Sequence, residues 1–323
     1  MTAMVISVVI TTMNRPVEFR VALKSVLSQS YEHKQIVAVV DGSKDTLKNY
    51  AKVIEEFEEQ VDFVFLGDKK NGHGPSFSRN IGIEQSYGQY IAFLDDDDIW
   101  SDEEHLARFA GIVKESNCAA LPELYFTHQQ AKYPDGKLHE NAIWLEGLID
   151  KINFDASGVS RISVDKLLFS RGFGHMNCTI ALRTLVQDIN GFDEALRYEE
   201  DRDFYYRLLD KASRIFISKY YIGIHFIPSG RSSASNLNNS LFRCTQQLQS
   251  ALKLISTLKR KKIIAKVEKS AAYTAQNLAN IHYAKNDMRR AKRFVLLSLA
   301  LKFTLGALKA LARILIYKKT KNE

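Results

Sequence analysis

The chain has 323 residues, of which 46% are apolar and 25% are charged, as is typical of a globular protein. Its three cysteines, Cys118, Cys178 and Cys244, lie far apart without a CxxC spacing. This spacing argues against a disulfide framework or a zinc site and suits a reducing cytosol. The apolar start at residues 5–10 is too short for a secretory signal, so we expect a first strand there.

Charge is distributed unevenly along the chain. The net charge is +8, yet residues 236–323 hold 19 Lys and Arg against three Asp and Glu, a net of +16. The first 235 residues therefore carry a net charge of −8. We expect an acidic domain at 1–235 and a basic helical extension at 236–323 that meets a polyanion, either nucleic acid or an anionic lipid surface. The alternative is a solvated basic face without a partner.

Strands alternate with helices along the first domain. Apolar runs that end at turn residues predict strands, and apolar residues at a 3.6-residue spacing predict helices. The expected strands are 5–12, 35–40, 61–66, 90–94, 119–126, 176–182 and 214–226, and the expected helices start at Pro16 and occupy 44–59, 76–87, 102–116 and 198–212. This alternation predicts an α/β fold with a mostly parallel sheet and helices on both faces. Residues 128–175 show no sustained period, and we interpret them as an insertion beside the site.

Four consecutive carboxylates, Asp95–Asp98, follow the apolar strand at 90–94. The run reads as a strand buried on both faces, which places the acids at its carboxyl end, where open α/β sheets bind ligands. Carboxylates this close repel one another, and a hard divalent cation relieves the repulsion. The alternative is a solvated acidic turn that caps the next helix.

Five motifs follow one another along the chain: TTMNRP (11–16), VVDGSKD (39–45), GPSFSRNIGI (74–83), YGQYIAFLDDDDIW (87–100), and GFDE (191–194) with EEDRDFYYRL (199–208). Their order resembles that of the family 2 glycosyltransferases of the GT-A fold. The resemblance covers residues 5 to about 235, and each motif alone is weak, whereas the five in this order are specific. The resemblance implies a Rossmann-like sheet that binds a nucleotide-sugar.

The resemblance also implies a bound Mn²⁺ or Mg²⁺ at the Asp cluster. Asp97 is the expected metal ligand, and Asp95 or Asp96 is expected to share the metal or reach the ribose. The physical need is the diphosphate leaving group, whose developing charge a divalent ion neutralises. His225, on the last strand, is a further candidate ligand, although a lone histidine on an apolar strand is more often a core residue.

The same resemblance assigns residues to the nucleotide. Asp41 is expected to accept the N3–H of uracil, although Asp-Gly-Ser also supports an Asx turn. Arg79 is expected to face the diphosphate or to brace the acids, and Asn80 to support its loop. The pocket at the end of the first strand is expected to be lined by Thr11, Thr12, Asn14 and Arg15.

Asp201 matches the aspartate of the family's ED motif and is the expected catalytic base for a single displacement with inversion. Neighbouring acids such as Glu200 would raise its pKa toward neutrality. The alternative is a helix N-terminus enriched in acids, which the macrodipole favours. On the acceptor side we expect Glu200, Trp100, which either stacks on the sugar or packs in the core, and Arg231, which would clamp phosphate.

The C-terminal region is helical in composition. Residues 271–300 predict a helix–turn–helix pair that turns at 285–287, and residues 299–317 predict one amphipathic helix. Lys302, Lys309 and Arg313 fall on one side of that helix, which suits an interfacial helix on an anionic leaflet. The alternative is a helix packed on the protein itself.

Together these features predict a metal-dependent inverting glycosyltransferase that uses a UDP-sugar and a saccharide or lipid-linked acceptor. It would act at the cytoplasmic membrane face, like bacterial enzymes that build lipopolysaccharide, capsule or exopolysaccharide, with no nucleic acid expected. One alternative is a sugar nucleotidyltransferase, but residues 11–19 lack the glycines of its phosphate loop. The other is a non-catalytic scaffold that binds nucleic acid through its basic helices.

Overall fold

The computed structural model describes residues 4–42, 44–67, 69, 71–116, 121–138, 145, 147–170, 172–227 and 240–320, apart from the side chains of 44–46 and 317–320. The chain divides into two units, Met1–Ser229 and Gly230–Glu323. The domain boundary expected at residue 235 lies outside the described residues.

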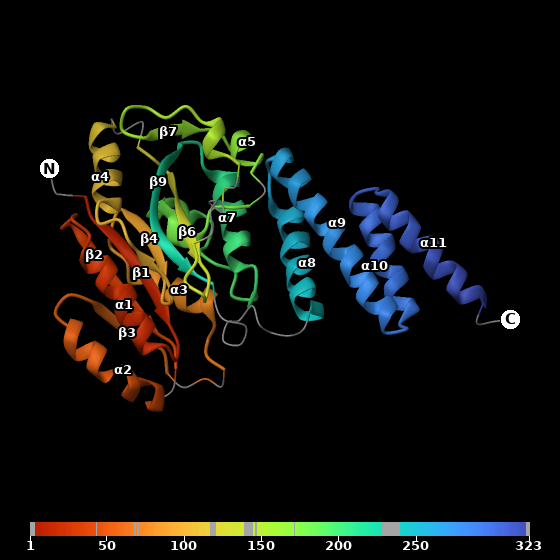
Figure 1. Ribbon diagram of the computed structural model, residues 1–323, viewed down its shortest axis with the longest axis horizontal. Coiled ribbons are helices and arrows are strands. Elements are labelled where there is room, and N and C mark those ends of the chain that lie inside the picture. The colour runs from red at the N-terminus through yellow and green to blue at the C-terminus, as the bar shows by residue number, and fades with distance from the viewer. Residues whose placement is uncertain are drawn as a thin grey trace. The chain divides into compact units, whose positions relative to one another are not determined.

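The first unit is built on one mixed sheet (Figure 1). Its strands are β1 (Ile6–Thr12), β2 (Lys34–Val40), β3 (Asp62–Phe65), β4 (Tyr90–Asp95), β5 (Ile99–Trp100), β6 (Leu124–Lys132), β7 (Val159–Ile162), β8 (Thr179–Leu182) and β9 (Ile215–Phe226). Their order is β3-β2-β1-β4-β8-β6-β9-β5, and β7 pairs with β9. The strands β3, β2, β1 and β4 pair in parallel, as the sequence predicted, whereas β8 lies antiparallel between β4 and β6.

Helices cover both faces of this sheet. They are α1 (Pro16–Leu27), α2 (Lys44–Phe57), α3 (Pro75–Glu84), α4 (His105–Glu115), α5 (Val164–Leu167), α6 (Arg183–Asp188) and α7 (Glu200–Lys211). Alternate residues of β1, such as Val8, join a core formed with α1, α2 and α4. On the opposite face α3 packs so closely that a Cβ on Gly82 would lie 2.3 Å from Val9 Cγ1. Phe93 of β4 packs on that face against Phe204 of α7.

Several of the predicted boundaries differ from the structure. The strand predicted to end at residue 126 continues to Lys132, because β6 pairs in parallel with β9 along this polar stretch. The insertion predicted at 128–175 therefore begins inside a strand, and it also contains β7 and α5. The strand predicted at 176–182 starts at Thr179, since Met176–Cys178 form a short 3₁₀ turn.

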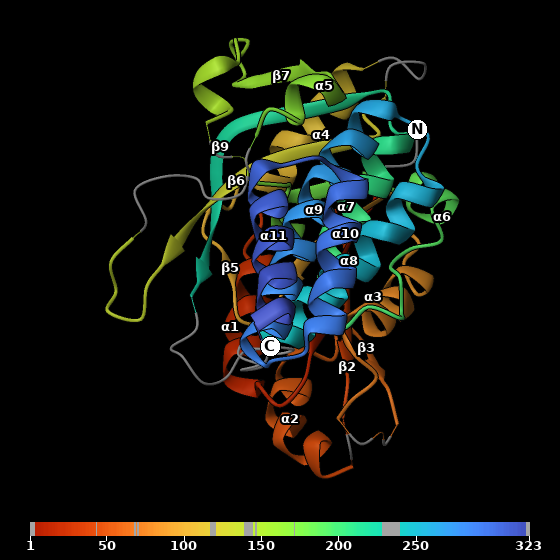
Figure 2. The ribbon, with the colours of Figure 1, turned by 90° about the vertical axis from the view of Figure 1, so that its right-hand side faces the viewer.

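The second unit is helical, and its consecutive helices pack side by side (Figure 2). They are α8 (Ser240–Thr257), α9 (Lys261–Ala284), α10 (Met288–Leu301) and α11 (Leu305–Thr320). The turn predicted at 285–287 is confirmed, and the Asp287 side chain caps α10 by accepting the N–H of Arg290 at 3.0 Å. The single helix predicted at 299–317 is wrong. The backbone is extended at Lys302, and Thr304 Oγ1 accepts the N–H of Ala307, which starts a new helix.

Helix α11 is apolar on two sides. Ala307, Ala310 and Ile314 are buried, and the last two pack in a core shared with α9 and α10. The opposite side exposes four large apolar side chains, Leu305, Leu308, Leu315 and Ile316. One face of α11 therefore packs on the protein, as the alternative predicted, whereas the other face is not covered by the helices of its unit. In the described part of the chain, none of the helices has the length and apolar character needed to span a membrane.

A glycine fixes the approach of β5 to β9. A Cβ added to Gly223 would lie 2.3 Å from the carbonyl oxygen of Ile99, closer than any real contact. Because that oxygen belongs to the backbone, a larger residue must push the two strands apart.

We expect Gly223→Ala to lower the free energy of unfolding by about 1–3 kcal/mol through this overpacking. Urea denaturation measures the change. Gly111→Ala is the matched control, because α4 leaves open space there and alanine favours the helix. Equal stability of the two variants would contradict the tight contact.

Candidate active site

Strand register assembles the acidic cluster. In the β4–β8 pair Ala92 lies opposite Ile180, so continuing the antiparallel register places Asn177 opposite Asp95. Accordingly, Asn177 Oδ1 accepts the backbone N–H of Asp95 at 2.8 Å. The first acid of the cluster is thereby held by a residue 82 positions further along the chain.

A second antiparallel pair positions the last acid. In the β5–β9 pair Ile99 lies opposite Ile224, which brings Asp98 beside His225. Asp98 Oδ2 lies 2.8 Å from His225 Nδ1, and Asp98 Oδ1 accepts the N–H of Phe226 at 2.9 Å. Asn177 Nδ2 also donates to Asp98 Oδ2, so one amide side chain contacts both ends of the cluster.

Three side chains at this point form a candidate metal site. One ligand atom each from Asp95, Asp98 and His175 lies within 4.8 Å of the others. Burial lowers the pKa of His175 to about 4, so its imidazole is neutral at pH 7 and keeps a lone pair for a metal. Two carboxylates and an imidazole suit Mn²⁺, and the carboxylates suit Mg²⁺. The residues present therefore fit the divalent ion that the resemblance implies.

This trio differs from the predicted ligands Asp95, Asp97 and His225. Asp97 instead accepts a 2.5 Å hydrogen bond from Arg15 Nη1, and His225 bonds Asp98. Asp97 and His225 therefore stay predictions, and the candidate site adds Asp98 and His175 to Asp95. The sequence carries no local signal for His175, because only the antiparallel pairing of β8 with β4 brings it to the acids.

The residues predicted at the end of β1 do gather around the acids. Thr12 Oγ1 donates to Asp96 Oδ2 at 2.7 Å, and Arg15 Nη1 lies 3.1 Å from Asp96 Oδ1. Burial raises the pKa of Asp96 to about 6, and burial together with the neighbouring acids raises that of Asp97 to about 7. Thr11 lies opposite the last residue of β4 in the sheet register, and Asn14 adopts φ 58° in the turn that follows.

Asp41 organises the loop before α3. Its carboxylate accepts the backbone N–H groups of His73 and Gly74 and the hydroxyl of Ser78, and it lies 2.9 Å from the ring Nδ1 of His73. Burial alone would raise the pKa of Asp41, but the hydrogen bonds outweigh it and lower the pKa. Its predicted bond to a nucleotide base would share oxygens that these donors already contact.

Arg79 braces the acids, which was one of its two predicted roles. Its Nη2 donates to Asp95 Oδ1 at 2.9 Å, and its Nη1 donates to Glu200 Oε1 at 3.0 Å. Burial alone would lower the pKa of Arg79, yet these carboxylates hold it above its ordinary value. Glu200, predicted on the acceptor side, is thus engaged in this ion pair. The neighbouring Asn80 bonds both backbone groups of Phe192, in agreement with its predicted support of a loop.

Asp201 follows Glu200 in the first turn of α7. Its Oδ1 accepts the N–H of Arg202 at 2.7 Å. Burial raises the pKa of Asp201 to about 7, and the charges of Glu200 and Glu199 add to the effect. A carboxylate with this pKa suits a general base near neutral pH.

The remaining acceptor-side predictions have different outcomes. Trp100 is 2% exposed, donates from Nε1 to the carbonyl of Asn177 at 3.0 Å, and packs edge-on against His105. The packing alternative for Trp100 therefore holds, and its indole is not available to stack on a sugar. Arg231 lies outside the described residues.

Mn²⁺ titration monitored by electron paramagnetic resonance decides which residues bind the metal: Asp95, Asp98 and His175, or the predicted set of Asp95, Asp97 and His225. We expect Asp98→Asn and His175→Ala to weaken Mn²⁺ binding by roughly tenfold or more, because each removes a ligand atom. Asp97→Asn is the matched control and should change the affinity less. A larger loss of Mn²⁺ affinity in Asp97→Asn than in the other two variants would instead support the predicted ligands.

The raised pKa of Asp201 sets a pH dependence. A base acts in its ionised form, so we expect the catalytic rate to rise with pH through an inflection at about 7. Glu199→Gln removes one charge that raises this pKa, so the inflection should move to lower pH. A pH–rate profile unchanged in Glu199→Gln would contradict the assignment.

Known structures share this fold at low sequence identity. The crystal structure of S. aureus TarS 1-349 in complex with UDP-GlcNAc is 18% identical, with a TM-score of 0.61 over 96% of this chain and 79% of that one. The mannosyltransferase PcManGT of Pyrobaculum calidifontis, in complex with GDP-Man and Mn²⁺, is 13% identical, with a TM-score of 0.55 over 95% of this chain and 78% of that one. These likenesses confirm the GT-A type of fold.

Sequence relatives match over shorter stretches. A Campylobacter jejuni GalNAc(5)-diNAcBac-PP-undecaprenol beta-1,3-glucosyltransferase is 30% identical over 93 residues, 29% of each chain. The Bacillus subtilis putative teichuronic acid biosynthesis glycosyltransferase TuaG is 33% identical over 95 residues, 29% of this chain and 36% of that one. The matches thus span about a third of each relative. Residues 7–162, just under half of the chain, match the family model described as glycosyl transferase family 2.

Proposed function

We propose that this protein is a metal-dependent inverting glycosyltransferase that moves a sugar from a UDP-sugar to a saccharide or lipid-linked acceptor. The observation that carries the proposal is the Arg79 bridge. It links Asp95, at the place for the diphosphate, to Glu200, the residue before the candidate base Asp201. The arginine would thereby connect the residues that bind the donor with the residue that activates the acceptor.

The comparisons support the donor and the setting. TarS, whose fold is similar, has been solved in complex with UDP-GlcNAc and with UDP. The C. jejuni relative is named for a glucosyl transfer onto an undecaprenol-linked saccharide, and TuaG for teichuronic acid synthesis. These names favour cell-surface polysaccharide synthesis, with an acceptor carried on lipid or on the growing saccharide.

In the proposed reaction Asp201 accepts the proton of an acceptor hydroxyl. The hydroxyl oxygen attacks the anomeric carbon from the side opposite the nucleotide, and the bond from that carbon to the diphosphate oxygen breaks. UDP leaves with the electron pair, so the configuration at the anomeric carbon is inverted. Mn²⁺ or Mg²⁺, held by Asp95, Asp98 and His175, would neutralise charge on the leaving diphosphate. Arg79 holds Glu200, the neighbour of the base, at a fixed position relative to Asp95.

A donor panel tests this proposal. Purified protein is mixed with UDP-, GDP-, dTDP- and CMP-sugars, with Mn²⁺ or with EDTA, and thermal stability and slow donor hydrolysis are recorded. We expect a UDP-sugar to stabilise the protein only with metal. Asp201→Asn should retain this stabilisation but lose turnover by about 10²-fold or more, because it removes the base. Stabilisation by none of these donors would contradict the proposal.

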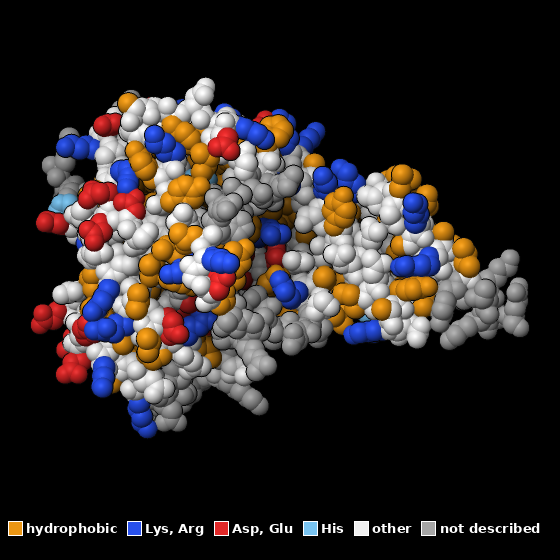
Figure 3. Space-filling model, in the orientation of Figure 1, with side chains coloured by type: hydrophobic (Ala, Val, Ile, Leu, Met, Phe, Trp, Pro, Cys, Tyr) orange, Lys and Arg blue, Asp and Glu red, His pale blue; other side chains and the backbone are white. Residues whose placement is uncertain are grey.

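We further propose that the protein works peripherally at the cytoplasmic membrane face through α11. Supporting this, Leu305, Leu308, Leu315 and Ile316 are exposed on one side of that helix. Figure 3 shows apolar side chains beside Lys and Arg on α10 and α11, the combination that binds anionic bilayer surfaces.

Sedimentation with phosphatidylglycerol vesicles tests the membrane role. We expect Leu305→Gln/Leu308→Gln to reduce the bound fraction several-fold, because these residues would insert among the acyl chains. Val17→Gln/Val21→Gln is the control, since it also removes two exposed apolar side chains, but from α1. An equal loss of vesicle binding in both variants would contradict the assignment of membrane binding to α11.

A further inference from the structure

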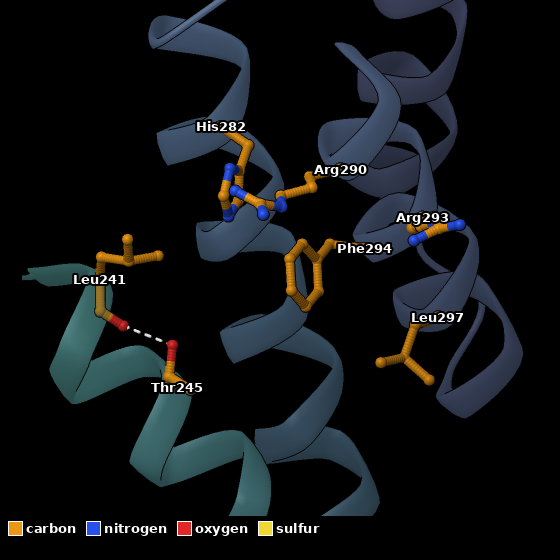
Figure 4. Close-up of a pocket in the computed structure, with 7 residues that line it drawn as sticks. All are labelled: Leu241, Thr245, His282, Arg290, Arg293, Phe294 and Leu297. Atoms are coloured by element: carbon orange, nitrogen blue, oxygen red, sulfur yellow. Dashed lines mark hydrogen bonds between the residues drawn. The ribbon is translucent and has the colours of Figure 1, made fainter. Parts of the chain in front are cut away.

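The helical unit contains a pocket that the transfer reaction does not use. It has a volume of about 430 Å³, within the range of small-molecule sites. Figure 4 shows it between α8 and the α9–α10 pair, with Phe294 near its centre. The lining residues are Leu241, Thr245, His282, Arg290, Arg293, Phe294 and Leu297.

The floor of this pocket is apolar. Leu241 of α8 and Leu297 of α10 contribute aliphatic side chains, and the ring of Phe294 lies between them. Phe294 also stacks on His282, with ring centroids 5.5 Å apart and planes inclined by 15°. The hydroxyl of Thr245 already donates to the carbonyl of Leu241, so it adds little polarity. A purely polar ligand would leave this surface uncovered.

The rim is cationic. Arg290, Arg293, Phe294 and Leu297 follow the i, i+3, i+4, i+7 spacing of one helix face, and all four line the pocket. Figure 4 shows the Arg290 guanidinium beside His282, with Arg293 on the other side of Phe294. Asp287 is the acid nearby, with its Oδ2 3.5 Å from Arg290 Nη1 and 3.6 Å from the His282 ring. This carboxylate offsets part of the charge of Arg290, in a region with 19 Lys and Arg against three acids.

We propose that this pocket binds the phosphate end of an anionic amphiphile, with Arg290 on the phosphate, Arg293 adding positive charge at the rim, and the apolar floor against the adjoining hydrocarbon. Arginine pairs with phosphate through parallel N–H donors, and such charge-assisted bonds are strong. The ligand is either a membrane phospholipid or a soluble phosphorylated molecule with an apolar group. This proposal does not depend on the transfer reaction, because no active-site residue lines the pocket.

The test uses the full-length protein and calorimetry with three probes: dodecyl phosphate below its micelle concentration, inorganic phosphate, and dodecanol. We expect dodecyl phosphate to bind, with inorganic phosphate and dodecanol each weaker by roughly tenfold or more, since each lacks one half of the interaction. Equal affinity for dodecyl phosphate and either of the other probes would overturn the proposal.

A pair of variants locates the binding. Arg290→Gln/Arg293→Gln should weaken dodecyl phosphate binding by roughly tenfold or more. Arg289→Gln/Lys292→Gln removes the same charge from exposed positions of the same helix outside the pocket, and it should keep the wild-type affinity. Equal weakening by both double variants would show diffuse attraction to the basic helices and would contradict a pocket.

The two ligand sources are then distinguished with vesicles of phosphatidylglycerol in phosphatidylcholine. If the ligand is a bilayer lipid, the pocket variant should bind these vesicles less than the control variant does. If it is a soluble molecule, the two variants should bind vesicles alike and still differ in dodecyl phosphate affinity. Either result supports the pocket, whereas no difference in both assays rejects it.

Discussion

The buried guanidinium of Arg79 is the interaction on which the site depends. It extends from α3 to a carboxylate of β4 on one side and to one of α7 on the other, so three elements meet at a single charged group. Removing one partner from such a buried pair leaves an uncompensated charge and typically costs about 3–5 kcal/mol. Asp201, the next residue after Glu200, is positioned through this contact. The candidate base is therefore placed by electrostatics that begin at the acidic cluster.

The cluster itself is held together against repulsion. Asp95 and Asp98 are satisfied by Arg79, Asn177 and His225, whereas Asp96 and Asp97 retain raised pKa values although Arg15 pairs with both. Burial, together with the neighbouring acids, raises these pKa values, so the two carboxyl groups favour proton uptake or a cation, and at neutral pH a divalent ion would compete well. In the proposed function, the free energy spent on gathering four acids would strengthen the binding of a metal and of the diphosphate that it holds.

Much of this arrangement was predictable from local sequence. Asp95 follows an apolar run and Asp201 opens a helix, so their places in the chain and their resemblance to a family predicted where they lie. His175 and Asn177 carry no comparable local signal, because the β4–β8 register alone brings them to the acids. Likewise the β5–β9 pair, with two paired residues on β5, places His225 beside Asp98. Long-range antiparallel pairing is what periodicity and motif order do not reveal.

The central claim is that the acidic cluster holds a metal for the diphosphate of UDP. Calorimetric titration of UDP into the wild-type protein, with Mn²⁺ and then with EDTA, tests it most directly. The account predicts that Mn²⁺ tightens UDP binding by roughly tenfold or more and, by linkage, that UDP tightens Mn²⁺ binding by the same factor. UDP binding of equal strength in Mn²⁺ and in EDTA would contradict the account.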